Sequence, residues 1–314
     1  MTATTASPQA PPASRRRRHR LSWLTDRWLV KLVILIVVII WLIPTLGLLV
    51  TSFRPTDDIN ASGWWTAIPN LFDKATWTIS NYDAVLSRQG FGNAFLNSLA
   101  VTIPSTVIPI TIAAFAAYAF AWMDFKGRHI LFVVVVGLLV VPLQMALIPI
   151  LRLYTSGAQV FGVTIFPDLD LNGTYLAVWL AHTGFGLPLA VYLLRNFIGS
   201  LPSSIIESAR IDGADHYKIF TRLIIPLSVP VLASFAIFQF LWVWNDLLVA
   251  LIFLGGEPQN RVLTQALMEL NASRGNEWQL LTAGAFISML LPLVVFFSLQ
   301  RYFVRGLTAG SVKG

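Results

Sequence analysis

Cysteine is absent from the 314 residues, and charged side chains make up only 12% of them. The absence of cysteine excludes disulfides, iron–sulfur clusters, thiolate zinc sites and a cysteine nucleophile. The scarcity of charge, with 56% hydrophobic residues and a mean hydropathy of +0.69, excludes an ordinary soluble domain, which carries about 25% charged residues. Most of this chain therefore needs an apolar solvent, which points to a membrane.

The signatures of common active sites are also missing. No Gly-Lys dipeptide exists, so there is no P-loop for ATP, and neither H-E-x-x-H nor G-x-S-x-G occurs. The four histidines are scattered, and only His182 falls inside an apolar run, where we interpret it as a packing residue. The net charge of +7 is distributed between apolar runs rather than gathered for nucleic acid. We expect no catalytic residue, no metal site and no cofactor in this chain.

Long stretches without Asp, Glu, Lys or Arg are the strongest positive feature. Each is long enough for a membrane-crossing helix, which needs about 20 residues, and too long for a strand. The six windows are 32–53, 89–123, 130–151, 171–194, 223–245 and 278–300. In the second window we place the crossing helix at 97–122, with 89–96 as an amphipathic lead-in. We therefore predict an all-α membrane protein with six transmembrane helices.

The stretches between the windows set the orientation. Sixteen Lys and Arg residues fall on one side and six on the other, which predicts that both termini are cytoplasmic. The Arg15–Arg18 run resembles an export signal, but the apolar run after it exceeds a 7–15-residue signal core. We expect an uncleaved first helix, preceded by a disordered basic cytoplasmic tail over 1–28 that touches anionic lipid.

Prolines recur in or beside the windows, and each removes a backbone donor and can kink a helix. Neighbouring helices or water must then satisfy the freed carbonyl groups. Ordinary helix curvature is one interpretation of the pattern. The number of prolines favours the other, a bundle with hinges and a cavity. The prolines are Pro44, Pro104, Pro109, Pro142, Pro149, Pro188, Pro226, Pro230 and Pro292.

Asp246 follows Asn245 near the end of the fifth window, and two interpretations stay open for it. An ionisable group at membrane depth indicates a functional site. The alternative is that Asp246 lies at the outer boundary, which Trp242 and Trp244 would support as interface residues.

The segment between the fourth and fifth windows, 195–224, reads as folded structure rather than a linker. Ser204 and Glu207 form an S-x-x-E capping box that predicts a helix starting near Ile205. Gly213 is placed to end that helix in the left-handed conformation, and a second helix from Ala214 is bounded by Pro226. We expect Ile205, Ile206 and Ala209 to line one side of the first helix.

The charges on the polar side of this helix–turn–helix indicate whether its partner is lipid or another protein. A helix resting on lipid favours basic flanks. This one carries Glu207, Asp212 and Asp215, which suits a protein with basic groups.

The segment Glu207-Ser-Ala-x-x-Asp212-Gly213-Ala214, followed by Phe220, Ile225-Pro226-Leu227 and Pro230, resembles the EAA loop of binding-protein-dependent ABC importer permeases. The C-terminal residues 299–314 are similar to the end of maltose-type, MalG-like sugar permeases, and Trp244-Asn245-Asp246 resembles their fifth-helix segment. Ser208 departs from the pattern, because the family has alanine there.

The resemblance implies that 29–314 is the permease domain of a type I ABC importer. Such a chain pairs with a second permease to enclose the translocation path, and its EAA loop docks on ATP-binding cassette subunits. An extracytoplasmic binding protein delivers the sugar, and the loop from Gly255 to Glu277 reaches toward it. ATP and Mg²⁺ belong to the partner subunits. The implied location is the bacterial plasma membrane, and the implied substrate is a di- or oligosaccharide, with α-glucosides among the candidates.

The resemblance also assigns residues to roles. The implied ATPase-coupling residues are Glu207, Ser208, Ala209, Asp212, Gly213 and Ala214. Gly306 and Lys313 are the implied C-terminal ATPase contacts, and Asn245 and Asp246 are candidates for the substrate path. The main alternative is a stand-alone ion-coupled secondary transporter, for which Asp246 is the only acid within reach of the membrane. A receptor or scaffold that signals through the same loop is a further alternative, although it gives no reason for the proline-rich bundle.

Overall fold

The computed structural model describes residues 22–88, 90–273 and 277–308. Within them, five helices are long and apolar enough to cross a membrane, and one bent pair of helices provides a sixth crossing if it counts as one span. The five are Trp28–Ser52, Phe91–Trp122, Tyr175–Gly199, His216–Trp244 and Trp278–Arg301, and the pair is Arg128–Val140 with Leu143–Ser156. The predicted all-α membrane fold is confirmed, with the third crossing broken.

Thirteen α-helices are assigned within the described residues, and the longer connections follow α2 and α6. Their bounds are α1 Ser22–Ser52, α2 Thr56–Ala61, α3 Ser80–Asp83, α4 Phe91–Trp122, α5 Arg128–Gly137, α6 Leu143–Ser156, α7 Tyr175–Gly199, α8 Ser203–Ile211, α9 His216–Ile219, α10 Ile225–Trp244, α11 Leu248–Phe253, α12 Leu263–Ser273 and α13 Trp278–Thr308. Because α1 already begins at Ser22, the last residues of the expected tail 1–28 are helical, and 1–21 lie outside the described residues.

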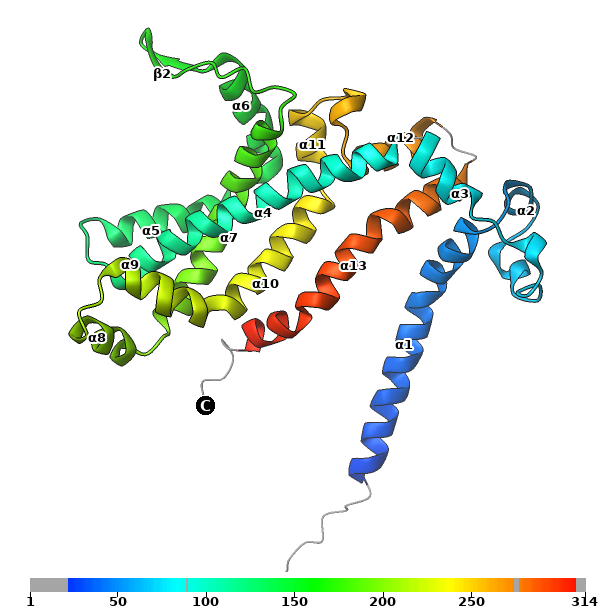
Figure 1. The fold of residues 1–314 in the computed structure, drawn as a ribbon, viewed down its shortest axis with the longest axis horizontal. Helices are drawn as coiled ribbons and strands as arrows, with labels where there is room; N and C mark the ends of the chain where they lie inside the picture. The colour runs from blue at the N-terminus through cyan, green and yellow to red at the C-terminus, as the bar shows by residue number, and fades with distance from the viewer. Residues whose placement is uncertain (1–21, 89, 274–276, 309–314) are drawn as a thin grey trace, which may run out of the picture.

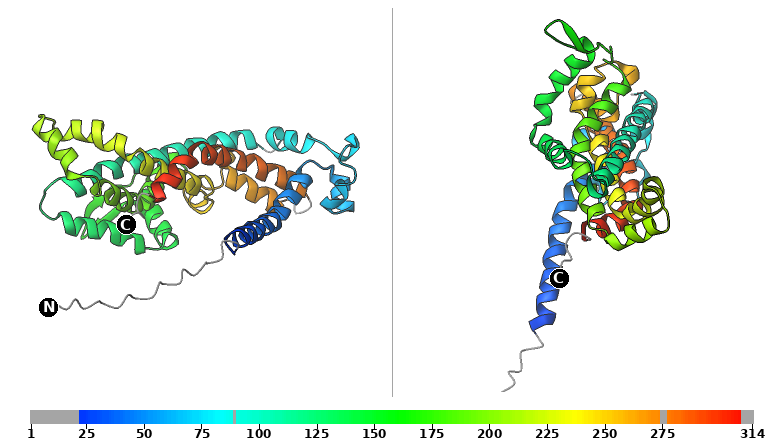
Figure 2. Two further views of the ribbon diagram at one scale, coloured as in Figure 1. Left: turned by 90° about the horizontal axis from the view of Figure 1, so that it is seen from below. Right: turned by 90° about the vertical axis from the view of Figure 1, so that its left-hand side faces the viewer.

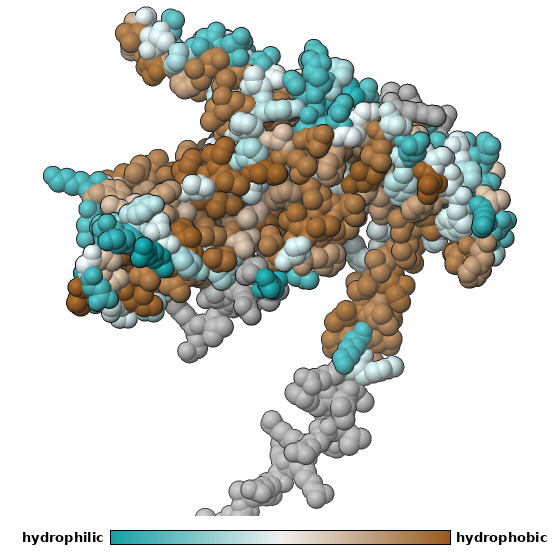
Figure 3. All heavy atoms as spheres, in the orientation of Figure 1, coloured by the Kyte–Doolittle hydropathy of each residue, from teal (hydrophilic) through white to brown (hydrophobic). Residues whose placement is uncertain are grey.

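The chain runs back and forth between two ends of the molecule. In Figure 1 the start of α1, the end of α13 and α8 lie in the lower part of the view, whereas α2, α6, α11 and α12 lie in the upper part. We call these the lower and upper ends. Figure 3 shows hydrophobic surface over the middle of the molecule and hydrophilic surface toward α8 and toward the upper end. This banding is what a protein that spans a membrane requires.

The third crossing is not the continuous helix that 130–151 predicts. Helix α5 ends at Gly137, a 3₁₀ turn covers Leu138–Val140, and α6 starts after Pro142 at an angle of 107°. Proline disfavours helical backbone in the residue before it, and Val141 is indeed extended, with ψ 116°. The apolar window was therefore correct about composition but could not reveal the bend.

The predicted lead-in 89–96 is also wrong as a separate segment, because α4 is helical from Phe91 onward. Phe91 is fully buried, and a Cβ on Gly284 of α13 would come within 2.9 Å of its ring. Packing on α13 thus extends α4 beyond the stretch that hydropathy alone selects.

The core of the bundle is the contact between α4 and α7. Small buried side chains, among them Ala113 and Ala117 on α4 and Ala190 on α7, let the two backbones approach closely, as is usual between membrane helices. Helix α1 differs, because almost all of its apolar side chains are exposed and its first turns project away from the bundle, whereas its last turns contact α13 (Figure 2).

A small antiparallel hairpin projects from the upper end between α6 and α7. Its strands are β1 Ala158–Val160 and β2 Val163–Phe166. The turn uses positive φ at Phe161 and Gly162, and the Phe161 side chain is fully exposed.

Candidate coupling surface and substrate path

Helix α8, the first helix of the predicted coupling segment, spans Ser203–Ile211. Its N-cap is Pro202, and no side chain caps it, so the predicted Ser204–Glu207 capping box is wrong. The helix starts one residue before Ser204, whose carbonyl accepts the Ser208 hydroxyl at 2.8 Å. Ile206 is only 2% exposed and packs among residues of α7 and α9, which seats α8 on the bundle.

Gly213 ends α8 as predicted, with φ of +79°. The N–H of Ala214 donates to the Ala209 carbonyl at 2.9 Å, and the N–H of Gly213 donates to the Arg210 carbonyl at 3.0 Å. This pair of bonds is the Schellman motif, in which a residue without Cβ takes the left-handed position. The turn direction of the coupling segment is thereby fixed by backbone bonds.

The second helix of the segment is capped by a residue that the sequence analysis treated only as an acid. The Asp215 carboxylate accepts the N–H of Lys218 at 2.8 Å and starts α9. Next to it, His216 Nδ1 shares a 2.8 Å hydrogen bond with the buried Tyr118 hydroxyl of α4. The coupling segment is therefore attached to the bundle on two sides.

Pro226 does not bound this second helix, contrary to prediction. Helix α9 passes through a π-helical segment, Phe220–Ile224, directly into α10, so that His216–Trp244 is one helix. A π turn bonds i to i+5. Such a turn directly before Pro226 accommodates the missing N–H without a break. The charge-free window begins this crossing only at 223, because it excludes Lys218 and Arg222. Both residues nevertheless lie on the continuous helix.

The predicted coupling residues divide into two groups. Glu207, Ser208, Asp212 and Gly213 are exposed, whereas Ala209 and Ala214 are half-buried and pack inward. A shallow hollow of about 300 Å³ at the turn is lined by Asp212 together with Lys218 and Arg222, so the surface carries both signs of charge.

Ile211 is the residue that the sequence analysis missed on this surface. It ends α8 with its side chain 86% exposed, beside the acids. Its position directly before Asp212 and Gly213 is the only sequence signal that could have pointed to it.

Asp246 lies just beyond the end of α10, at the upper end of the molecule. Its carboxylate accepts the N–H groups of Val249 at 2.9 Å and Ala250 at 3.2 Å, so it caps α11. Its Oδ2 is also 3.8 Å from Nε2 of His182 on α7. Burial raises the pKa of the Asp246 carboxyl, and the backbone hydrogen bonds act in the opposite direction. Asp246 therefore has a structural role as a helix cap, and its position at membrane depth or at the outer boundary stays a prediction.

The remaining predicted residues are less closely grouped. Asn245 is exposed and donates to its own helix at Leu241. Trp244 is buried and donates to the Ser288 carbonyl of α13 at 2.9 Å, so it is not an interface residue. Gly306 falls in the last turns of α13, and Lys313 lies outside the described residues.

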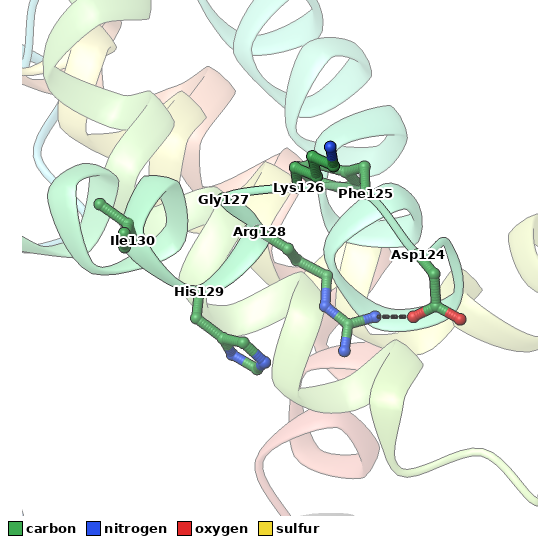
Figure 4. A pocket seen from close by; sticks show the side chains of 7 residues that line it. All are labelled: Asp124, Phe125, Lys126, Gly127, Arg128, His129 and Ile130. Atoms are coloured by element: carbon green, nitrogen blue, oxygen red, sulfur yellow. Dashed lines mark hydrogen bonds and ion pairs between the residues drawn. The ribbon is translucent and has the colours of Figure 1, made fainter.

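A second hollow, of about 590 Å³, lies at the turn between α4 and α5. Figure 4 shows Arg128 paired with Asp124, with Lys126 and His129 pointing in other directions. The ion pair measures 3.0 Å. This turn presents basic groups beside the exposed apolar side chains of Phe125 and Ile130.

Comparison with known proteins identifies relatives along nearly the whole chain. The osmoprotective compounds uptake permease protein GgtD of Synechocystis sp. is 57% identical, covering 90% of this chain and 91% of the relative. The α-glucoside transport system permease protein AglG of Rhizobium meliloti is 46% identical, covering 91% of this chain and 97% of that protein.

The fold also has a solved counterpart. A chain in the crystal structure of a bacterial alginate ABC transporter, in complex with an alginate pentasaccharide-bound periplasmic protein, superposes with a TM-score of 0.66 at 15% identity. The match covers 89% of this chain and 95% of that one. Residues 109–309 match the family described as binding-protein-dependent transport system inner membrane component. That segment contains α5 to α13, including the helix–turn–helix of α8 and α9, and the chain belongs to this family.

Proposed function

We propose that this chain is the permease subunit of an ATP-driven importer for α-glucosides and related small saccharides, and that it forms half of the translocation path. The observation that carries the proposal is the exposed helix–turn–helix of α8 and α9, held rigidly and continuous with a membrane-spanning helix. The names of the relatives, an osmoprotectant permease and an α-glucoside permease, support the substrate class.

The exposed part of α8 is the contact surface for an ATPase subunit in this proposal. Glu207, Ser208 and Asp212 supply polar contacts, and the exposed Ile211 is an apolar anchor between them. Gly213, Ala209 and Ala214 shape the turn. ATP and Mg²⁺ bind to the ATPase subunits, of which two serve the permease pair, and Gly306 and Lys313 extend the contact from the C-terminal end.

The other partners follow from the exposed surfaces. A second permease subunit covers part of the exposed apolar side of α1, which a bundle-facing helix would not leave bare. An extracytoplasmic sugar-binding protein docks on the loop from Gly255 to Glu277 at the upper end, away from α2, as the family description and the solved complex with a periplasmic protein support. Anionic lipid contacts the basic turn between α4 and α5 and the arginine-rich tail.

The lower end, with the start of α1, the end of α13 and α8, faces the cytoplasm in this proposal, and so do both termini of the chain. The membrane is the bacterial plasma membrane. The excess of Lys and Arg on that side supports this orientation. The alternative of an ion-coupled secondary transporter loses its support, because the carboxylate it relies on, Asp246, is engaged in capping α11.

A charge reversal on α8 tests the proposal. Uptake of radiolabelled trehalose, sucrose and maltose is measured in a strain that lacks the gene and carries it again on a plasmid. Glu207→Lys should abolish uptake while the protein remains in the membrane at the wild-type level. Asp57→Lys makes the same charge change on exposed α2 at the opposite end and should leave uptake intact. Wild-type uptake in Glu207→Lys would contradict the coupling role.

The absence of cysteine allows a direct test of the contact. A single Ile211→Cys variant, labelled with a photoactivatable cross-linker in membranes, should cross-link to an ATPase subunit. The Phe161→Cys control places the label on the exposed hairpin turn at the upper end and should give no such product.

A further inference from the structure

A cavity of about 580 Å³ is lined by residues of the bent pair α5–α6, of α7 and of α10. Its walls are mostly aliphatic side chains, with a few polar groups from α7 and α10. Small-molecule sites in helical bundles have this composition and measure roughly 300–1,000 Å³. The cavity is separate from the coupling surface, which lies at the lower end.

One bend and two glycines in the surrounding helices shape the cavity. The 107° bend after Val141 moves α6 away from the line of α5. On α7, a Cβ on Gly184 would meet no atom within 4 Å, so this glycine leaves open space. Gly186 instead allows the Gln239 side chain of α10 to lie against the α7 backbone, within 2.7 Å of where a Cβ would be.

Pro188 leaves a hydrogen-bond acceptor at this cavity. Proline has no N–H, so the carbonyl of Gly184, four residues earlier in α7, lacks its ordinary helical donor. No side chain of the described residues donates to that carbonyl in its place. Gly184 therefore presents an acceptor that a ligand hydroxyl can use.

Trp242 provides the complementary donor and a flat apolar face. Its side chain is 37% exposed, and its indole N–H has no acceptor among the described residues. Trp244, two residues further, is buried and does have one. The Trp242 ring meets the ring of His182 at 87°, with centroids 5.4 Å apart, and His182 in turn faces Asp246.

We propose that this cavity is a saccharide subsite, in which a glycosyl ring packs on Trp242 and its hydroxyl groups bond to the Gly184 carbonyl and the Trp242 indole. A sugar hydroxyl both donates and accepts, which matches this pair of groups, whereas a lipid acyl chain does neither. His182 is a positioning residue that fixes the indole plane. The inference rests on the proposed function, because it assigns the subsite to the path of the imported sugar.

The test uses the whole transporter, with its second permease, ATPase subunits and binding protein, reconstituted in liposomes. Trp242→Ala should lower the rate of radiolabelled trehalose uptake about tenfold or more, because an aromatic packing contact and a hydrogen bond are lost together. ATP hydrolysis stimulated by the liganded binding protein should persist, since the coupling surface is intact. Trp242→Phe keeps a ring without the N–H and should be intermediate.

Two further variants sharpen the result. Gly184→Leu should be accommodated by the helix, because leucine is a better helix former than glycine, and its side chain should fill the cavity and block uptake. Phe238→Ala removes an exposed aromatic ring from the same helix outside the cavity and should transport normally. His182→Ala should raise the KM for uptake more than it lowers kcat.

The possible outcomes separate the two proposals. If the wild-type complex imports no sugar, the proposed function fails. If the wild type imports sugar and both Trp242→Ala and Gly184→Leu do so at the same rate, the saccharide subsite is wrong. If those variants transport normally and Gly184→Leu also loses a co-purified phospholipid, the cavity holds lipid, which likewise overturns the subsite.

Discussion

The Gln239 side-chain nitrogen donates a hydrogen bond to the backbone carbonyl of Ser105 at 3.1 Å, from α10 to α4. Ser105 lies four residues before Pro109, whose missing N–H leaves that carbonyl without its helical donor. A side chain of one membrane helix thus completes the backbone bonding of another. This arrangement is what the proline pattern in the sequence predicted, and Gln239 is the residue that carries it out.

The first prediction concerns the contribution of the Gln239–Ser105 hydrogen bond to the free energy of unfolding. Gln239→Leu should lower the free energy of unfolding by about 1 kcal/mol, because a buried carbonyl loses its donor. In a Pro109→Ala background, where the backbone N–H is restored, the same substitution should be nearly neutral. Thermal unfolding of the four proteins in detergent gives the double-mutant cycle. Equal losses in both backgrounds would show that the bond does not compensate for the proline.

The conformation of Gly213 leads to a second prediction. Gly213→Ala should destabilise the turn by about 1 kcal/mol, because a Cβ is unfavourable at positive φ. The change should reduce the amount of ATPase subunit that co-purifies with the membrane complex. Gly213→Asn should be milder, since asparagine tolerates the left-handed region.

Gly127 is the matched control for this experiment. It has φ of +81° in the turn between α4 and α5, and a Cβ there meets no atom within 4 Å, as at Gly213. Gly127→Ala therefore carries the same backbone strain at a turn that contributes no residue to α8 or to the hollow beside Gly213, and it should leave ATPase association unchanged. A similar loss in both variants would attribute the effect to general destabilisation.

Substitutions of Asp246 distinguish an importer driven by ATP from a transporter driven by an ion gradient. Asparagine is also a good N-cap residue, so Asp246→Asn should retain the cap of α11 and most of the sugar uptake. Asp246→Ala should lower stability by about 1 kcal/mol through loss of the cap. Uptake of labelled trehalose and thermal unfolding measure the two effects. Complete loss of uptake in Asp246→Asn, with a folded protein, would favour a proton-coupled mechanism.

The orientation of the chain is tested by labelling single cysteines in intact cells. Tyr217→Cys on α9 and Phe161→Cys at the hairpin turn both replace exposed side chains at opposite ends. A membrane-impermeant maleimide, applied after the outer envelope is permeabilised, should label only Phe161→Cys, and both should react in lysed cells. Labelling of Tyr217→Cys in intact cells would reverse the proposed topology and place α8 outside the cytoplasm.

The sequence predicted the crossings well because charge is excluded from a bilayer whatever the details of packing. It failed where local backbone bonding or tertiary contacts determine whether a helix bends, ends or continues. The bend at Pro142 and the continuous passage through Pro226 involve the same residue type with opposite outcomes. The second depends on a π turn at Phe220–Ile224, which neither hydropathy nor charge spacing reveals.

The candidate site was also only partly predictable. The left-handed Gly213 follows from a glycine placed at the end of a short amphipathic helix, and the structure agrees. The capping box failed because Pro202 starts the helix earlier. Trp242 and Gln239 could not be selected, because their importance depends on which helix faces them across space.

The helix from His216 to Trp244 has 29 residues, which corresponds to about 43 Å at 1.5 Å per residue. One end follows the turn at Gly213, and the other carries Trp242, whose indole lines the cavity. Because α9, the π turn and α10 follow one another without a break, a displacement of α9 also acts on the upper part of α10. In the proposed importer, movement of the α8–α9 segment by an ATPase subunit would therefore reach the cavity beside Trp242 along one continuous helix.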